Sequence, residues 1–273
     1  MSKLLAITVL LSSLVEASSS NEKIEGFLKK TYGANPNIKS INVKITNKVE
    51  IQERNGWDAY FIELDAILKK DKRQVVQKQV WFSDGKVLSK ELYDLNSGQD
   101  MRDLVSVPFK DEYYKKENLI YGNANAKHKV AIFSDPLCPF CKVFVPEAIN
   151  EMRKQPNKFA IYYYHFPLPS LHPAAVELVN AAVALELKGR KNVVLDLYKV
   201  EVDPKEKSVE KILEAFNKVM NSNIRMYDLM QKDVVKHIKS DLTIADELMV
   251  QGTPTIFFDG KIDKTKNKYK AVK

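Results

Sequence analysis

The sequence of 273 residues predicts a mixed α+β and α/β protein, in which a small antiparallel-sheet domain precedes a larger domain of alternating strands and helices. Residues 18–105 carry one short helical pattern and several strand patterns separated by turn signals. Residues 121–273 change to a strand–helix–strand order. The charged stretch between them, residues 106–120, is expected to form a helical linker.

The overall composition indicates a soluble globular protein. Hydrophobic residues make up 45% of the chain and charged residues 29%, so burial of a core can offset the conformational entropy lost on folding. The net charge of +8 raises the question of nucleic-acid binding. The lysines are spread along the chain and do not gather beside aromatic residues, so no nucleic-acid partner is expected.

The first 17 residues have the pattern of a secretory signal peptide. Lys3 supplies a basic region, the stretch from Leu4 to Val15 is largely apolar, and Val15-Glu16-Ala17 resembles a cleavage site. A membrane-spanning helix needs about 18 to 20 apolar residues, and this stretch is shorter. We therefore expect cleavage after Ala17 and export to an oxidising compartment outside the cytoplasm.

The first domain is expected to begin with a helix over Asn21–Tyr32, whose apolar residues fall on one face. Three strand patterns follow, at Ile38–Ile51, Ala59–Leu68 and Val75–Leu92. The third is interrupted by Ser83-Asp84-Gly85-Lys86, and Asp-Gly between apolar runs favours a hairpin turn. This domain carries no obvious catalytic group.

The second domain combines strands and helices in a recognisable order. Strands are predicted at residues 129–134, 159–166 and 255–259, and helices at residues 139–154, 173–188, 208–219 and 226–248. The first helix begins within the motif Cys138-Pro139-Phe140-Cys141, and the last strand follows Thr253-Pro254. This is the order of a thioredoxin fold with a helical insertion at about residues 170–250. The lysine-rich end, residues 261–273, is expected to be a solvated tail.

The two cysteines of the chain, Cys138 and Cys141, are separated by two residues. A disulfide between them would close a very small loop and would contribute little to stability. A structural zinc ion would need four ligands, and the chain has no third cysteine and four scattered histidines. We therefore expect no metal and no other cofactor, and we assign the pair a redox role.

The predicted helix gives the two cysteines different roles. Cys138 lies at the helix N-terminus, where unpaired backbone amides and the helix dipole favour a thiolate. Pro139 suits the first turn, because its missing N–H would have no partner there. Cys141 lies one turn further in and is expected to be buried. We expect Cys138 to attack a substrate disulfide and Cys141 to resolve the resulting mixed disulfide.

A second element of the site is expected at Thr253-Pro254. A proline that leads a strand after Gly-Thr can take a cis bond, which usually marks a tight turn. Such a turn would leave the backbone of Thr253 free to pair with an extended substrate strand. Pro139 and Phe140, between the cysteines, are also expected to contact the substrate.

Three segments resemble the catalytic domain of the periplasmic DsbC/DsbG family of dimeric disulfide isomerases and reductases: Lys129–Cys141 (KVAIFSDPLCPFC), Ile161–Pro167 (IYYYHFP) and Val250–Gly260 (VQGTPTIFFDG). The resemblance implies a thioredoxin-like domain with Cys138 as nucleophile, Cys141 as resolving thiol and a cis proline at Pro254. It also implies that residues 18–105 form the dimerisation domain of a periplasmic homodimer.

The same resemblance implies the partners. The substrates would be unfolded or misoxidised secreted proteins, whose non-native disulfides the protein isomerises or reduces. A membrane redox partner, either a DsbD-like reductant or a DsbB-like oxidant, would set its redox state. Phe140, where the strong oxidases tend to carry His, and Thr253, where they carry Val, favour the isomerase.

Two alternatives remain. The segment Phe166–Pro169, together with His172, also resembles DsbA-like oxidases that donate disulfides. The other alternative is a chaperone or assembly factor. In that case the first domain would bind unfolded chains, and the thiols would have a secondary role.

Two residues before the cysteines bear on the proton chemistry. Asp135 either tunes the thiols or caps the turn before the helix. Ile132 lies on the buried strand at a position where some thioredoxin-fold proteins carry an acid that relays the proton of Cys141. With isoleucine there, the proton is expected to leave through water or another group.

Overall fold

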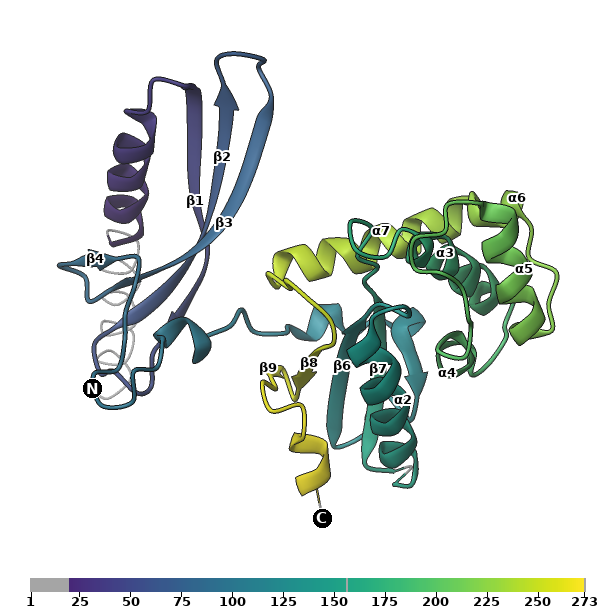
Figure 1. Cartoon of the computed structure of the whole chain (residues 1–273). Coiled ribbons are helices and arrows are strands. Elements are labelled where there is room, and N and C mark those ends of the chain that lie inside the picture. Colours follow the sequence, from purple (N-terminus) through teal and green to yellow (C-terminus); the bar gives the residue numbers. More distant parts are fainter. Residues whose placement is uncertain (1–19, 156, 273) are drawn as a thin grey trace, which may run out of the picture. The chain divides into compact units, whose positions relative to one another are not determined.

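The computed structural model describes residues 20–155 and 157–272 (Figure 1). The expected signal peptide, residues 1–17, lies outside the described residues. The chain divides between Val107 and Pro108 into two compact units. In the part of the chain that is described, no helix is long and apolar enough to cross a membrane.

The first unit is an antiparallel sheet with one helix packed against it (Figure 1). Its strands, in the order β1-β2-β3-β4, are Ile38–Glu50, Asp58–Leu68, Gln74–Ser83 and Leu88–Ser89. The helix spans residues 20–33, and Ile24 and Leu28, one turn apart, form a buried cluster with Tyr60 and Ile62 of β2. The spacing of these apolar residues therefore fixes which face of the helix meets the sheet.

The turn between β3 and β4 follows directly from its sequence. Gly85 has a φ of 87°, a conformation that glycine adopts without strain. The Asp84 carboxylate accepts hydrogen bonds from the backbone N–H groups of Lys86 at 2.9 Å and Val87 at 2.7 Å. The strand predicted to reach Leu92 ends at Ser89, whose hydroxyl donates to the Glu91 carbonyl and so competes with strand pairing.

The second unit is built on a five-stranded sheet with the order β5-β7-β6-β8-β9. The strands are β5 Leu119–Tyr121, β6 His128–Ser134, β7 Phe159–His165, β8 Thr255–Phe258 and β9 Lys261–Ile262. The central strands β6 and β7 are parallel and are joined by helix α2, Pro139–Arg153, whereas the outer pairings are antiparallel. Every residue of β7 is buried, as expected for a strand covered on both faces.

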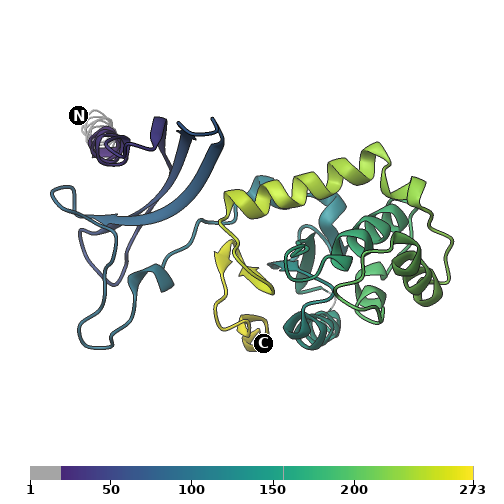
Figure 2. The ribbon, with the colours of Figure 1, turned by 45° about the horizontal axis from the view of Figure 1, so that its top comes forward.

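Helices cover this sheet on both sides. Helix α7, Lys232–Glu247, and helix α2 lie on opposite sides of the sheet (Figure 2). Between β7 and β8 the chain forms the helical insertion, made of α3 Ala174–Leu187, α4 Val193–Leu197, α5 Val209–Met220, α6 Met226–Leu229 and α7. The single helix predicted over residues 226–248 is two helices, because Gln231 between them has an extended backbone with ψ of 138°.

The predicted helical linker, residues 106–120, is not a continuous helix. It contains two short 3-10 turns, at Asp111–Tyr113 and Lys116–Asn118, followed by strand β5. Phe109 and Tyr113 are buried, and Phe109 contacts the aromatic rings of β6, β7 and β8. Residues from Pro108 onward therefore belong to the second unit, held there by aromatic packing that helix periodicity does not reveal.

The C-terminal segment, expected to be a solvated tail, is folded. Strand β9 pairs with β8, and Tyr269 is only 3% exposed and meets the Phe144 ring of α2 edge-on. The buried Asp263 carboxylate accepts backbone N–H groups of Lys266 and Lys268 and so fixes the turn after β9. The expectation of a solvated tail was wrong. It rested on the many lysines of the segment, whereas the buried Tyr269 packs the segment against α2.

Candidate active site

Cys138 and Cys141 lie at the start of α2, close to the end of strand β6. Cys138 is the N-cap residue with an extended backbone, and its carbonyl accepts the N–H of Lys142, which begins the helix. Pro139 occupies the first helical position. Both cysteines are free thiols; Cys138 is 6% exposed and Cys141 is fully buried.

The residues beside Cys138 form an apolar surface. Pro139 and Phe140 are both exposed, and Phe140 has 78% of its surface accessible. Val143, one turn further along α2, is 73% exposed. Phe140 and Val143 therefore leave exposed apolar surface on the first turns of α2, beside the Cys138 thiol.

The Thr253-Pro254 segment reaches the cysteines because β8 pairs with β6. Phe133 is opposite Thr255 in this antiparallel ladder, so the turn before β8 lies beside the loop that precedes α2. The Thr253–Pro254 peptide bond is cis. The Cys138 sulfur lies 3.6 Å from the Thr253 carbonyl oxygen and can donate its hydrogen there. The structure thus brings together Cys138, Cys141, Thr253 and Pro254.

Asp135 holds the loop before α2 in place. Its fully buried carboxylate accepts the N–H of Leu137 at 2.7 Å and the N–H of Leu168 at 2.8 Å. The Nδ1 atom of His172 lies 3.0 Å from the same carboxylate. Of the two roles considered from the sequence, capping of the turn is therefore observed, and the carboxylate also ties this loop to the proline-rich segment after β7.

Polar groups near Cys141 act on its thiol. Burial raises the pKa of the Cys141 thiol to about 11, and the Ser134 and Thr253 hydroxyls and the Asp135 backbone partly oppose this rise. The Thr253 hydroxyl is buried and has no hydrogen-bond partner within 3.5 Å among the described residues. Ile132 is fully buried in a hydrophobic cluster that also contains Cys141.

Two tyrosines extend this polar environment and were not found from the sequence. Ser134 Oγ lies 2.6 Å from Tyr198 Oη, and Tyr163 Oη lies 2.8 Å from Tyr198 Oη. All three side chains are buried. Ser134 stands two residues after Ile132 on the same strand face, which was an available signal, whereas Tyr198 comes from the helical insertion and only the fold brings it near.

A second group of buried titratable side chains joins α3 and α7 to the end of β7. His165 Nε2 lies 3.5 Å from Glu186, and His237 Nε2 lies 3.7 Å from Asp241. The Asp241 carboxylate accepts a hydrogen bond from the Asn118 side-chain amide at 2.7 Å and one from the backbone N–H of His165 at 2.8 Å. Burial raises the pKa of Asp241 to about 7. Burial lowers the pKa of His165, but Glu186 more than offsets this and the net shift is upward.

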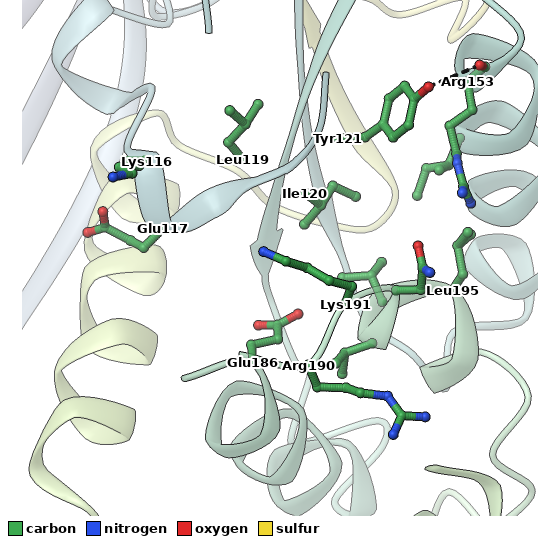
Figure 3. Close-up of a pocket in the computed structure, with 14 residues that line it drawn as sticks. Lys116, Glu117, Leu119, Ile120, Tyr121, Arg153, Glu186, Arg190, Lys191 and Leu195 are labelled. Atoms are coloured by element: carbon green, nitrogen blue, oxygen red, sulfur yellow. Dashed lines mark hydrogen bonds between the residues drawn. The ribbon is translucent and has the colours of Figure 1, made fainter. Parts of the chain in front are cut away.

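Within residues 20–155 and 157–272, no three or more His, Cys, Asp or Glu side chains are grouped so as to hold a metal ion. A pocket of about 380 Å³ lies beside β5 (Figure 3). It is lined by the apolar Leu119 and Ile120 and by the charged Lys191 and Glu186, and Tyr121 donates a hydrogen bond to the Arg153 carbonyl there. Neither cysteine lines this pocket, so it is separate from the thiol site.

Comparison with known proteins gives one family match. The family model described as thioredoxin matches residues 115–273. Among curated proteins, the Na(+)/H(+) antiporter NhaA 1 of Mycolicibacterium gilvum is 26% identical over 147 residues, which are 52% of this chain. The match covers 23% of that antiporter, so the chain spans less than a quarter of its length.

Several solved structures are similar to part of the chain. BdbD from Bacillus subtilis is 16% identical, with 61% of this chain and 92% of that chain covered and a TM-score of 0.48. The thiol-disulfide exchange protein alpha-DsbA2 from Wolbachia pipientis is 19% identical, with coverage of 60% and 92% and a TM-score of 0.47. ScsC from Proteus mirabilis in a compact conformation is 21% identical, with coverage of 55% and 73% and a TM-score of 0.45.

Proposed function

Because the chain belongs to the thioredoxin family, we propose that it is a thiol–disulfide oxidoreductase whose reactive pair is Cys138 and Cys141. One observation carries the proposal: a cysteine at the N-cap of α2 lies 3.6 Å from the Thr253 carbonyl, with a second, buried cysteine one turn behind it. The helix N-terminus stabilises a thiolate on the first sulfur. The second cysteine is placed for intramolecular displacement.

The exchange proceeds in two steps. The Cys138 thiolate attacks a substrate disulfide, forms a mixed disulfide and releases one substrate sulfur as a thiolate. Cys141, as its thiolate, then attacks the Cys138 sulfur, forms the Cys138–Cys141 disulfide and releases the second substrate sulfur. The substrate gains two electrons and the cysteine pair loses them. In an isomerisation, a different substrate thiolate attacks the mixed disulfide instead, and the protein ends as it began, reduced.

We propose that the protein works chiefly as an isomerase or reductase of non-native disulfides in the periplasm. Its substrates are unfolded or misoxidised secreted proteins, which the exposed Phe140 and Val143 would contact beside the reactive sulfur. Phe140 offers no hydrogen bond to a Cys138 thiolate, which leaves the reduced form less stabilised than a histidine there would. A membrane redox partner, DsbD-like for this direction, would keep the pair reduced.

The second candidate is a DsbA-like oxidase that donates its disulfide and is reoxidised by a DsbB-like partner. The segment after β7 favours it, because His172 and Leu168 are bonded to Asp135 and so the oxidase-like segment borders the thiol site. Recovery of activity from scrambled ribonuclease, measured against oxidation of the reduced ribonuclease, separates the two. Efficient oxidation without recovery from the scrambled form would establish the oxidase. Suppression of aggregation by a double Cys→Ala variant would instead support the chaperone alternative.

We further propose that the first unit forms a homodimer. Among residues 20–155 and 157–272, strand β1 of 13 residues pairs on one side only, and such edge strands readily accept another strand. Sedimentation of residues 18–273 compared with residues 108–273 tests this. A monomeric longer chain would refute the dimer and would favour the oxidase.

A further inference from the structure

The resolving cysteine cannot react until it loses its proton. The thiolate and not the thiol is the nucleophile, and burial holds the pKa of Cys141 at about 11. Near neutral pH almost all of this residue is protonated. The second step of exchange therefore needs a group that accepts the proton as the sulfur attacks.

The nearest carboxylate is committed elsewhere. Asp135 contributes its backbone to the surroundings of Cys141, while its carboxylate bonds the Leu137 and Leu168 amides and His172. The strand position that would point an acid toward Cys141 is the apolar Ile132. The side chains that lower the pKa of Cys141 are hydroxyls, those of Ser134 and Thr253, whereas the Cys138 thiol on the same helix raises it.

Ser134 continues into a chain of hydroxyl groups. Its Oγ is 2.6 Å from Tyr198 Oη, which is 2.8 Å from Tyr163 Oη. Tyr163 and Tyr198 pack in one buried cluster with Cys141. Burial raises the pKa of both tyrosines, and a negative charge on Cys141 raises it further. Tyr198 also lines an open surface pocket of about 450 Å³ with Lys142 and Lys199. The Tyr198 side chain therefore lies between the buried hydroxyl cluster and this surface pocket.

We propose that the hydroxyl cluster of Ser134, Tyr198 and Tyr163 is the proton relay of Cys141, a proposal that rests on the proposed thiol–disulfide exchange. As Cys141 attacks, its proton passes to Ser134 Oγ, the Ser134 proton passes to Tyr198 Oη, and the Tyr198 proton passes to water in the surface pocket. The departing substrate thiolate takes up one proton from solvent, so protons balance. Every hydroxyl regains its hydrogen, and no tyrosine has to ionise for long.

The cluster has a second effect on the same atom. Hydroxyl groups rotate, so after the transfer Ser134 can donate a hydrogen bond to the Cys141 thiolate. The unpartnered Thr253 hydroxyl can donate another. Ser134 touches the reacting sulfur, whereas Tyr198 and Tyr163 act through Ser134 and are positioning residues.

The test compares three variants of the full chain with a matched control. Ser134→Ala, Tyr198→Phe and Tyr163→Phe each remove one hydroxyl of the cluster without removing a ring or a backbone group. Tyr164→Phe is the control: Tyr164 is fully buried, is the neighbour of Tyr163 on β7, points to the opposite face and bonds the Tyr113 carbonyl. Thermal unfolding of each variant establishes that it is folded.

The first readout is the titration of Cys141 itself. The chain has two cysteines, so selective ¹³Cβ labelling gives two resonances, which a Cys138→Ser variant assigns. Loss of a hydrogen bond to a charged group should lower the acid dissociation constant of the Cys141 thiol about 10-fold in Ser134→Ala. The effect should be smaller in Tyr198→Phe, which keeps the Ser134 hydroxyl. Tyr164→Phe should titrate like the unmodified protein. This readout needs no substrate, so it stands even if the proposed exchange activity is absent.

The second readout is the rate of the resolving step, measured in single turnover from a preformed mixed disulfide across pH 6 to 11. We expect Tyr198→Phe to slow this step about 100-fold at neutral pH, with recovery as the pH approaches 11, while attack by Cys138 is unchanged. If Cys141 titrates as in the wild type in both Ser134→Ala and Tyr198→Phe, and the resolving step keeps its wild-type pH profile in both, the relay is overturned. An equal loss in Tyr164→Phe would also overturn it, because general packing would then explain the effect.

Discussion

The Cys138 sulfur and the Thr253 carbonyl oxygen lie 3.6 Å apart, although 115 residues separate them in the chain. Two elements create this contact: helix α2 begins at Cys138, and β8 pairs with β6 so that the turn before β8 is brought beside the helix terminus. An extended chain bound at Thr253 would present its disulfide at the Cys138 sulfur. This relationship connects substrate binding with the chemistry of the thiol pair.

Phe140→His should make the protein a stronger oxidant. An imidazole between the cysteines can donate a hydrogen bond to the Cys138 thiolate and so stabilise the reduced form. We expect the equilibrium with glutathione to shift toward the dithiol by about 10-fold, or about 30 mV. Val143→His is the matched control, since Val143 is similarly exposed on the same helix. Equal potentials in the two variants would show that Phe140 does not control the redox direction.

Asp135→Asn should strongly destabilise the second unit. The buried carboxylate accepts two backbone N–H groups and pairs with His172, and an amide in its place would direct an N–H toward another donor. We expect the free energy of unfolding, from urea denaturation, to fall by about 3 kcal/mol.

Asp259→Asn is the control for this measurement. Asp259 also pairs with a histidine, His128, at 2.8 Å, but its side chain is 41% exposed, so the expected loss is less than about 1 kcal/mol. A small loss in Asp135→Asn would mean that the loop before α2 does not depend on this carboxylate.

Asp241→Asn should change how stability depends on pH. Burial raises the pKa of Asp241 from 3.8 to about 7, so the folded state binds this proton more tightly than the unfolded chain does. The associated stabilisation is present below about pH 4 and is lost as the pH rises through 7. The variant has no such proton, so the free energy of unfolding of the wild type minus that of the variant should fall between pH 4 and 7 and then level off.

Denaturant unfolding at several pH values measures this difference. A difference curve for Asp241→Asn that rises between pH 4 and 7 would contradict the raised pKa of Asp241.

The elements that sequence reasoning predicted best are those with strong local signals. The helix after Cys138 has proline at its first position and apolar residues at helical spacing, and it ends within one residue of the predicted Lys154. The thioredoxin-type order of strands and helices is confirmed by the family match over residues 115–273. Here the sequence was sufficient because the signals, a first-turn proline and apolar residues at helical spacing, lie within the element itself.

The features that sequence reasoning missed depend on contacts between distant segments. Tyr198 belongs to the helical insertion, and its hydroxyl meets Ser134 only after the insertion folds against the sheet. The segment after Gly260 looked solvated because its sequence is rich in lysine, yet Tyr269 packs on α2. Phe109 likewise ties the expected linker to the sheet through aromatic contacts that have no periodic signature.

The most direct test of thiol–disulfide exchange is to trap the mixed disulfide. Cys141→Ser, mixed with a peptide that contains one disulfide, should form a covalent adduct at Cys138, because the resolving thiol is absent. Intact-mass spectrometry should show one bound peptide on Cys141→Ser, released by reductant, and none on Cys138→Ser. Adducts on Cys138→Ser with none on Cys141→Ser, or no adduct on either variant, would contradict the assignment of Cys138 as the attacking thiol.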